Sequence, residues 1–152
     1  MSSPRVDVDG VSVSPDHYIN GERIASTRTF EDRSPLDWTW KLADVARATS
    51  VEADLAVSAA EAAFRAWAAF SVDERGTYLD RLADLIDRDV ASIAHVECLD
   101  MAMLEESLKL RVIGRGARNF RAYAELARNY EPRRWTSNGT ANTVLRLSLI
   151  HI

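Results

Sequence analysis

The sequence predicts a mixed α/β fold in which short strands come first, several helices follow, and a further strand comes last. Three observations predict this order: an Asn20-Gly21 turn between short β-like runs, a change to helical spacing from Thr49, and a second turn signal at Ser137-Asn138-Gly139. The 152 residues are enough for one domain with a sizeable core. No internal repeat or low-complexity tract interrupts the order.

The strand-rich part comes first. Residues 1–16 are polar and are predicted to form a flexible lead-in. Asn20-Gly21 then favours a type I′ hairpin, because both positions tolerate a positive φ. Further short strands are expected on either side of a turn at Ser34-Pro35, where proline removes a hydrogen-bond donor. The predicted strands in this part are 17–19, 22–24, 27–33 and 42–46.

The helical part begins at Thr49, which forms a predicted capping box with Glu52. Ser71 and Glu74 repeat this signature at the start of a second helix, and Pro132 ends the helical region. The alternation over 143–152 predicts a strand at the edge of the domain. The remaining predicted helices cover about 90–99 and about 104–130.

The composition is that of an ordinary soluble domain, with 47% hydrophobic and 28% charged residues. The net charge of −4 gives no reason to expect binding to nucleic acid or to an anionic membrane. No stretch resembles a signal peptide or approaches the roughly 18 apolar residues of a membrane span. The single cysteine, Cys98, excludes an internal disulfide framework and fits a reducing compartment, so we expect a cytoplasmic location.

Few residues qualify as sites from their spacing alone. Gly114-Arg115-Gly116 lacks the third glycine of a dinucleotide fingerprint and lies within a helical pattern, so close packing is the favoured interpretation. Cys98 follows His95 by three positions, but a buried structural thiol is favoured over a nucleophile. No metal site is expected, because the histidines have no metal-ligand spacing; they are His17, His95 and His151.

The arginines of the last predicted helix leave two interpretations open. Arg111, Arg115 and Arg118 are spaced i, i+4 and i+7 and would share one face. They are either a solvated face paired with Glu105, Glu106 and Glu125, or one or two of them bind a carboxylate substrate. Binding to a nucleic-acid backbone is disfavoured by the acidic chain. The residues alone therefore predict a domain without an assembled active site.

Six segments, in the correct order, resemble the aldehyde dehydrogenase superfamily over about residues 18–146. They cover the opening hairpin, the following turn, the first two helices, a Glu-x-Leu-Asp match and part of the long helix. The segments are Tyr18-Ile19-Asn20-Gly21-Glu22, Ser34-Pro35, 54–67, 74–86, Glu97-Cys98-Leu99-Asp100 and 119–124. The chain departs from the family at Met101-Ala102-Met103-Leu104, where relatives have a Thr-Gly-Lys-Pro-like turn, which leaves the helix break there open.

The resemblance implies an enzyme that oxidises an aldehyde to a carboxylic acid with NAD or NADP. Residues 115–120 look most like dehydrogenases of hydroxymuconic or aminomuconic semialdehydes, whose substrates carry carboxylates. In that case Arg115, with Arg111, would face the substrate channel and hold the anionic tail. The catalytic cysteine, the oxyanion donors and the cofactor residues lie later in such proteins, so no catalytic or cofactor-binding residue is expected here. Cys98 does not match the catalytic cysteine.

The resemblance also implies a domain organisation. Residues 17–146 would be the N-terminal part of the aldehyde dehydrogenase domain, and 147–152 a tail unlike the family. The Rossmann-type cofactor domain would be largely missing, so the chain alone is expected to be inactive and to bind no cofactor. The parent enzyme would be a homodimer or homotetramer. The alternative is a non-catalytic protein-interaction domain derived from the same fold.

Overall fold

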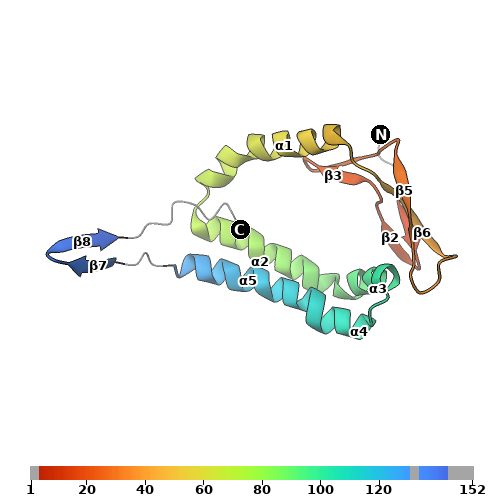
Figure 1. Cartoon of the computed structure of the whole chain (residues 1–152). Helices are drawn as coiled ribbons and strands as arrows, with labels where there is room; N and C mark the ends of the chain where they lie inside the picture. Colours follow the sequence, from red (N-terminus) through yellow and green to blue (C-terminus); the bar gives the residue numbers. More distant parts are fainter. Residues whose placement is uncertain (1–3, 131–133, 144–152) are drawn as a thin grey trace.

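The computed structural model describes residues 4–130 and 134–143, and within them every strand pairs only with its neighbour in the chain. The result is a series of antiparallel hairpins around a group of helices (Figure 1), which confirms the predicted mixed fold. The strands are β1 (Val6–Val8), β2 (Val11–Val13), β3 (His17–Ile19), β4 (Glu22–Ile24), β5 (Thr29–Arg33), β6 (Lys41–Ala46), β7 (Arg134–Ser137) and β8 (Thr140–Thr143).

Three of the hairpins turn on two residues that both have a positive φ, as a type I′ turn requires. Asn20-Gly21 has φ values of 53° and 80°, and Asn138-Gly139 has 51° and 78°, so both predicted turns are confirmed. Asp9-Gly10, with φ values of 49° and 84°, makes a third turn between β1 and β2. The expected flexible lead-in over 1–16 is therefore wrong for 6–13, where a valine-rich hairpin forms.

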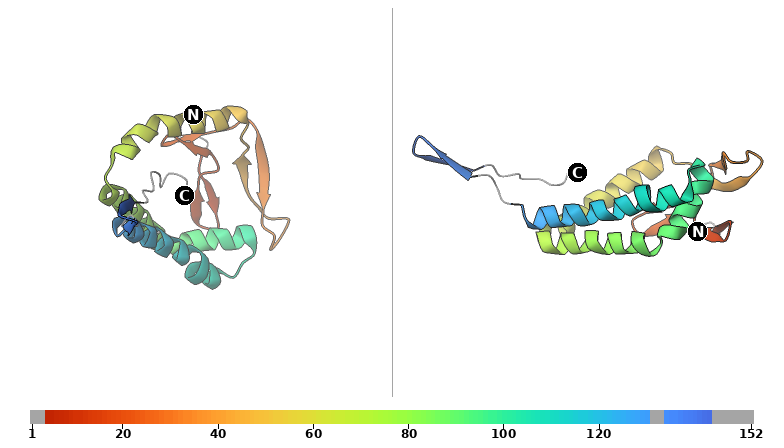
Figure 2. Two further views of the ribbon diagram at one scale, coloured as in Figure 1. Left: turned by 60° about the vertical axis from the view of Figure 1, so that its left-hand side comes forward. Right: turned by 90° about the horizontal axis from the view of Figure 1, so that it is seen from below.

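The predicted last strand is only partly within the described residues. β8 begins at Thr140, three positions before the predicted start, because Asn138-Gly139 closes a tight hairpin with β7. The rest of the predicted strand, and the whole predicted tail at 147–152, lie outside the described residues. The two-stranded β7–β8 hairpin extends beyond the ends of the helices, as Figure 1 and the right-hand view of Figure 2 show.

The helices begin where the sequence predicts. Both capping boxes are present: the Thr49 amide donates to Glu52 Oε2 at 2.7 Å, and the Ser71 amide donates to Glu74 Oε2 at 2.7 Å. The stretch predicted as one helix over 104–130 contains a π-helical segment, η1. The elements are α1 (Ser50–Ala69), α2 (Val72–Arg88), α3 (Val90–Met101), α4 (Glu105–Ser107), η1 (Leu108–Ile113) and α5 (Gly114–Arg128).

The break after α3 occurs without the glycine that such a turn usually has. Ala102 ends the helix in the left-handed conformation, with a φ of 54°, and its amide donates to the Cys98 carbonyl at 2.9 Å. For a residue with a Cβ this conformation costs about 1–2 kcal/mol. The sequence left this break open, and the structure places it directly after Met101.

The antiparallel pair α2 and α5 makes the most extensive contact between two elements of the described chain. The two helices lie side by side in Figures 1 and 2. Their buried residues are all small, which allows the helix axes to approach closely. These residues are Gly76 and Ala83 in α2, and Ala117 and Ala124 in α5.

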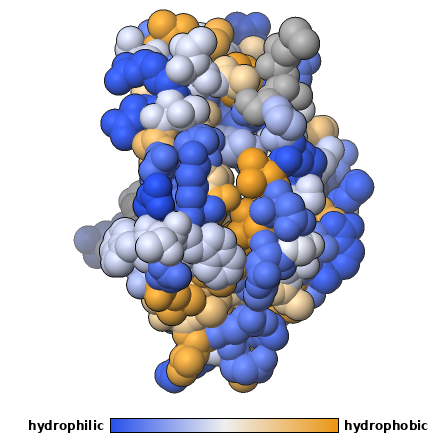
Figure 3. All heavy atoms as spheres, turned by 90° about the vertical axis from the view of Figure 1, so that its right-hand side faces the viewer, coloured by the Kyte–Doolittle hydropathy of each residue, from blue (hydrophilic) through white to orange (hydrophobic). Residues whose placement is uncertain are grey.

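A second, smaller core joins the strands to α3. Val8, Leu42 and Leu99 form this cluster, and each is at most 6% exposed. The buried Ser34 hydroxyl donates to the Leu99 carbonyl at 2.6 Å and so fixes the β5–β6 turn to the end of α3. On the strand face shown in Figure 3, apolar residues appear as patches between polar ones.

Helix α1 lies on the opposite side of the molecule from α5 (Figure 1) and has no buried residue. Its C-terminal end is joined to α2 by three rings: the Trp67 and Tyr78 centroids are 5.6 Å apart, and Phe70 stacks on Tyr78 at 5.6 Å. Among the described residues, no helix is both long and apolar enough to cross a membrane.

Candidate functional site

The predicted substrate-binding arginines lie at and just after a π-helical segment. The Gly114 amide donates to the carbonyl of Lys109, five residues back, which inserts one extra residue into the turn. A Cβ on residue 114 would lie 2.7 Å from that carbonyl oxygen, so only glycine fits without a shift of the backbone. The helical stretch predicted over about 104–130 is therefore present but contains a π-turn, and the i, i+4, i+7 spacing no longer places the three arginines on one regular α-helical face.

Most arginines of this helix already have partners, but not the predicted ones. Arg121 donates to Asp84 and Asp87 of α2 at 2.7 Å each, and Arg128 donates to Asp80 at 2.7 Å. Arg118 donates to the Leu110 carbonyl of η1 at 3.4 Å. None of the three glutamates expected as partners pairs with an arginine within the described chain. The prediction missed the aspartates of α2 because they are distant in sequence.

Arg111 and Arg115 differ from these arginines. Both are exposed, and neither side chain makes a hydrogen bond or ion pair to any described residue. Their guanidinium groups can each offer two parallel N–H donors to a carboxylate. The structure thus leaves available the two arginines that the sequence singled out, and their role in substrate binding stays a prediction.

Gly114-Arg115-Gly116 does not fit a dinucleotide. A phosphate cradle needs free backbone amides at the start of a helix that follows a strand. Here the Gly114 amide is bonded to Lys109, and the segment continues a helix that began earlier. The favoured interpretation of close helix packing does not apply at Gly114, because its close neighbour is the Lys109 carbonyl of its own π-turn rather than another helix. Nor does it apply at Gly116, where a Cβ would meet nothing within 4 Å.

His95 and Cys98 do not form a nucleophile and base. His95 Nε2 lies 2.9 Å from Asp9 Oδ2, and His95 Nδ1 lies 3.2 Å from Glu105 Oε2. These hydrogen bonds, first to Glu105 and then to Asp9, raise the pKa of His95 above 6.5. Cys98 is a free thiol that is only half-buried, whereas the favoured interpretation expected a buried one. A sequence pattern does not indicate the histidine bridge, because Asp9 is 86 residues away.

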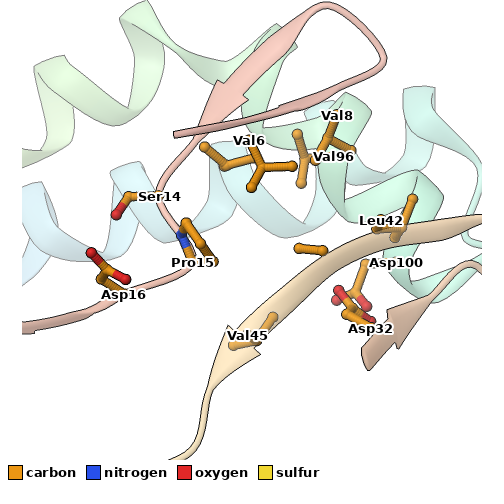
Figure 4. Close-up of a pocket in the computed structure, with 12 residues that line it drawn as sticks. Val6, Val8, Ser14, Pro15, Asp16, Asp32, Leu42, Val45, Val96 and Asp100 are labelled. Atoms are coloured by element: carbon orange, nitrogen blue, oxygen red, sulfur yellow. The ribbon is translucent and has the colours of Figure 1, made fainter. Parts of the chain in front are cut away.

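A cavity of about 220 Å³ lies between the first hairpin, β6 and α3 (Figure 4). Its wall is mainly apolar, with Val6, Val8 and Leu42 among its lining residues. Asp32 and Asp100 point toward one another at one side, and burial together with the charge of Asp100 raises the pKa of Asp32. Neither Arg111 nor Arg115 lines it.

The described residues hold no group of three or more histidine, cysteine, aspartate or glutamate side chains that could bind a metal ion. The described lining of the cavity holds no cysteine and no histidine that could activate a hydroxyl, and its polar residues are Ser14 and aspartates. The surface at Arg111 and Arg115 therefore remains the best candidate for recognition of a charged ligand.

Residues 23–149 match the aldehyde dehydrogenase family. The 2-hydroxymuconic semialdehyde dehydrogenase of Pseudomonas sp. (strain CF600) is 40% identical over 116 residues, which is 74% of this chain and 24% of that protein. The 5-carboxymethyl-2-hydroxymuconate semialdehyde dehydrogenase of Escherichia coli is 36% identical, over 72% of this chain and 23% of that protein. The chain thus spans about a quarter of the length of these relatives.

Solved structures show the same fold. HpcC from Thermus thermophilus superposes with a TM-score of 0.74 and 32% identity, over 82% of this chain and 24% of that chain. The indole-3-acetaldehyde dehydrogenase AldA of P. syringae, solved in complex with NAD+ and IAA, gives a TM-score of 0.79 at 25% identity. That match covers 86% of this chain and 27% of AldA.

Proposed function

Because the chain belongs to the aldehyde dehydrogenase family, we propose that it forms the N-terminal part of an enzyme that oxidises a carboxylated semialdehyde with NAD or NADP. The reaction converts the aldehyde, water and the oxidised cofactor into a carboxylic acid, the reduced cofactor and a proton. Two relatives named for hydroxymuconic semialdehydes support the substrate class. The observation that carries the proposal is that Arg115 and Arg111 are exposed without a partner in the described chain.

In this proposal the chain contributes scaffold and substrate recognition rather than chemistry. The nucleotide supplies the hydride acceptor when it is bound to the longer enzyme, and the described residues do not offer it a phosphate cradle. We therefore expect the chain by itself to be inactive and to bind no nicotinamide nucleotide. Micromolar binding of NAD to the isolated chain, measured by titration calorimetry, would contradict this expectation.

Arg115 of α5 is the residue proposed to hold the substrate carboxylate, together with Arg111, which lies four residues earlier in η1. A carboxylate that enters a substrate channel loses water and must recover that free energy from protein donors. A guanidinium without a competing protein partner can supply two charge-assisted hydrogen bonds at once. Arg121 and Arg128 are poorer candidates, because each is already bonded to aspartates of α2.

The test is Arg115→Ala in an intact enzyme that contains this segment. A charged hydrogen bond contributes about 1.5–3 kcal/mol, so KM for a dicarboxylic semialdehyde should rise by roughly ten- to a hundredfold. We expect kcat to change little, and the kinetics with a neutral aldehyde of similar length to stay as they are. Arg115→Lys should recover only part of the loss, because lysine keeps the charge without the bidentate geometry.

Arg81→Ala is the matched control, since Arg81 is also exposed on a helix and has no partner in the described chain. Arg81→Ala should leave KM unchanged for both the dicarboxylic and the neutral substrate. An unchanged KM for the dicarboxylic substrate in Arg115→Ala, or an equal rise for the neutral aldehyde, would show that Arg115 does not bind the carboxylate. We further propose that the longer enzyme is cytoplasmic and assembles as a homodimer or homotetramer.

A further inference from the structure

His95 connects two parts of the chain that are far apart in sequence. It lies on α3, between the Asp9-Gly10 turn of the first hairpin and Glu105 at the start of α4. Its two ring nitrogens each face a carboxylate, at 2.9 Å for Asp9 and 3.2 Å for Glu105. The ring is therefore a bridge that holds the hairpin turn against the helical part.

The bridge requires a particular protonation state. An ionised carboxylate only accepts hydrogen bonds, so a ring that bonds two carboxylates must donate from both nitrogens. Only the imidazolium form carries a proton on each nitrogen, whereas neutral imidazole carries one. Loss of a proton from His95 therefore leaves one of its two carboxylates facing a lone pair.

The two carboxylates are not equally dependent on His95. Glu105 also accepts from Lys109 Nζ at 2.7 Å, and Lys109 lies 3.0 Å from Glu106 as well. His95 is the only residue with which Asp9 forms an ion pair within the described chain. Glu105 thus keeps a cationic partner when the ring is neutral, and Asp9 does not.

We propose that His95 is a pH-dependent latch that holds the Asp9-Gly10 turn of the first hairpin onto α3 and α4 when doubly protonated and loosens its hold when neutral, because the ring then loses its positive charge and one of its two hydrogen bonds. The loosening is local, because Val8 remains in the core with Leu42 and Leu99. The charged groups that set the latch are Asp9 from the hairpin, Glu105 from α4, and Lys109 and Glu106 behind Glu105.

The pH range of the latch follows from the two pKa shifts. The bridge raises the pKa of His95 above 6.5, so its contribution is complete below 6.5 and is lost as the pH rises through the raised value. Lys109 first, and then His95, lower the pKa of Glu105 below 4.5, so the Glu105 contribution is lost only as the pH falls through that lower value. The latch therefore opens on the alkaline side, as the pH rises through the raised pKa of His95.

The test is an NMR titration of the full chain across the range in which imidazole titrates. The His95 ring should titrate above 6.5, and the backbone amides of Asp9 and Gly10 should shift with the same midpoint. In His95→Gln, which cannot become doubly protonated, this step at Asp9 and Gly10 should disappear. His17→Gln, the matched control in β3, should leave it unchanged.

Asp9→Asn provides a second measurement that does not depend on the fold of the His95 variant. Because Asp9 stabilises the imidazolium, its removal should lower the His95 midpoint, and Glu105→Gln should lower it further. A His95 midpoint at or below 6.5, a pH step at Gly10 that persists in His95→Gln, or an unchanged midpoint in Asp9→Asn would each overturn the proposal.

Discussion

Helix α1 and the pair α2–α5 are built by the same local rules but are used differently. α1 and α2 both begin with a complete capping box, and both have apolar residues at helical spacing. Yet α2 buries Gly76 and Ala83 against its partner, whereas α1 buries no residue along its 20 positions. Capping residues and apolar spacing therefore determine that a helix forms, but they do not determine which element it packs against.

The comparison of α1 with the α2–α5 pair also shows which of them exposes large apolar side chains. On α1, Leu55 is 48% exposed and Phe64 is 44% exposed, although both residues are of types normally found in cores. On the α2–α5 pair, aspartates and arginines cover the outside of a contact made by small residues. Large apolar side chains that remain exposed on a helix are typical of a surface that binds another protein segment. The contact face of the α2–α5 pair, in contrast, is already buried.

The largest expected difference in stability loss between the two regions comes from substitutions at the buried α2–α5 contact. Ala83→Leu adds three carbon atoms at a fully buried position of α2 and should destabilise the chain by about 1–3 kcal/mol. Ala60→Leu makes the same change at an exposed position of α1 and should alter stability by less than about 0.5 kcal/mol. Urea unfolding followed by circular dichroism measures both, and equal losses would show that α1 is as tightly packed as α2.

A smaller effect is expected at the helix caps. Thr49→Ala and Ser71→Ala each remove a capping hydroxyl, which should lower the free energy of unfolding by about 1 kcal/mol. Because α1 buries no residue and its ring contacts lie at its other end, its first turn should unwind and lose amide protection, whereas the first turn of α2 should stay helical while global stability falls. Residue-resolved hydrogen exchange distinguishes local unwinding of α1 from a global loss of stability. Equal fraying of the first turns of both helices would contradict the expected difference between them.

The smallest effect is expected at the surface charges. Arg121→Gln removes the contacts with Asp84 and Asp87, but all three groups are exposed to solvent and screened. The unfolding midpoint should move only slightly, and the difference from the wild type should shrink in high salt. Arg65→Gln on α1 is the matched control. A loss as large as that of Ala83→Leu would mean that charges, rather than small residues, hold the pair.

The predictable part of the fold is the part determined by neighbours in sequence. Asn20-Gly21 requires a positive φ at both positions, and Thr49 with Glu52 satisfies amides within one turn, so both features can be located without the structure. Asp9-Gly10 carries a similar turn signal, although the polar residues around it favour a flexible lead-in. An Asp-Gly pair flanked by valines is itself typical of a tight hairpin turn.

The remaining features depend on contacts between distant segments. The spacing of the arginines gave no indication that Arg121 would pair with α2 rather than with glutamates on its own helix. His95 could be noted as a neighbour of Cys98, but its bridge to Asp9 exists only after the chain folds back. At the candidate site, the sequence predicts a role for Arg111 and Arg115, and the structure adds that Arg118, Arg121 and Arg128 are already hydrogen-bonded within the chain.

The direction in which Arg111 points relative to α5 depends on the number of residues in the π-helical segment. An α-helix turns by about 100° per residue, and η1 holds one residue more than an α-helical turn would. Deleting a single residue such as Val112 would restore the regular helix and rotate everything before it relative to α5. Glu105 and Arg115 would then point in a new relative direction with no side chain exchanged. In this part of the molecule, an insertion or deletion is therefore a more drastic change than a substitution.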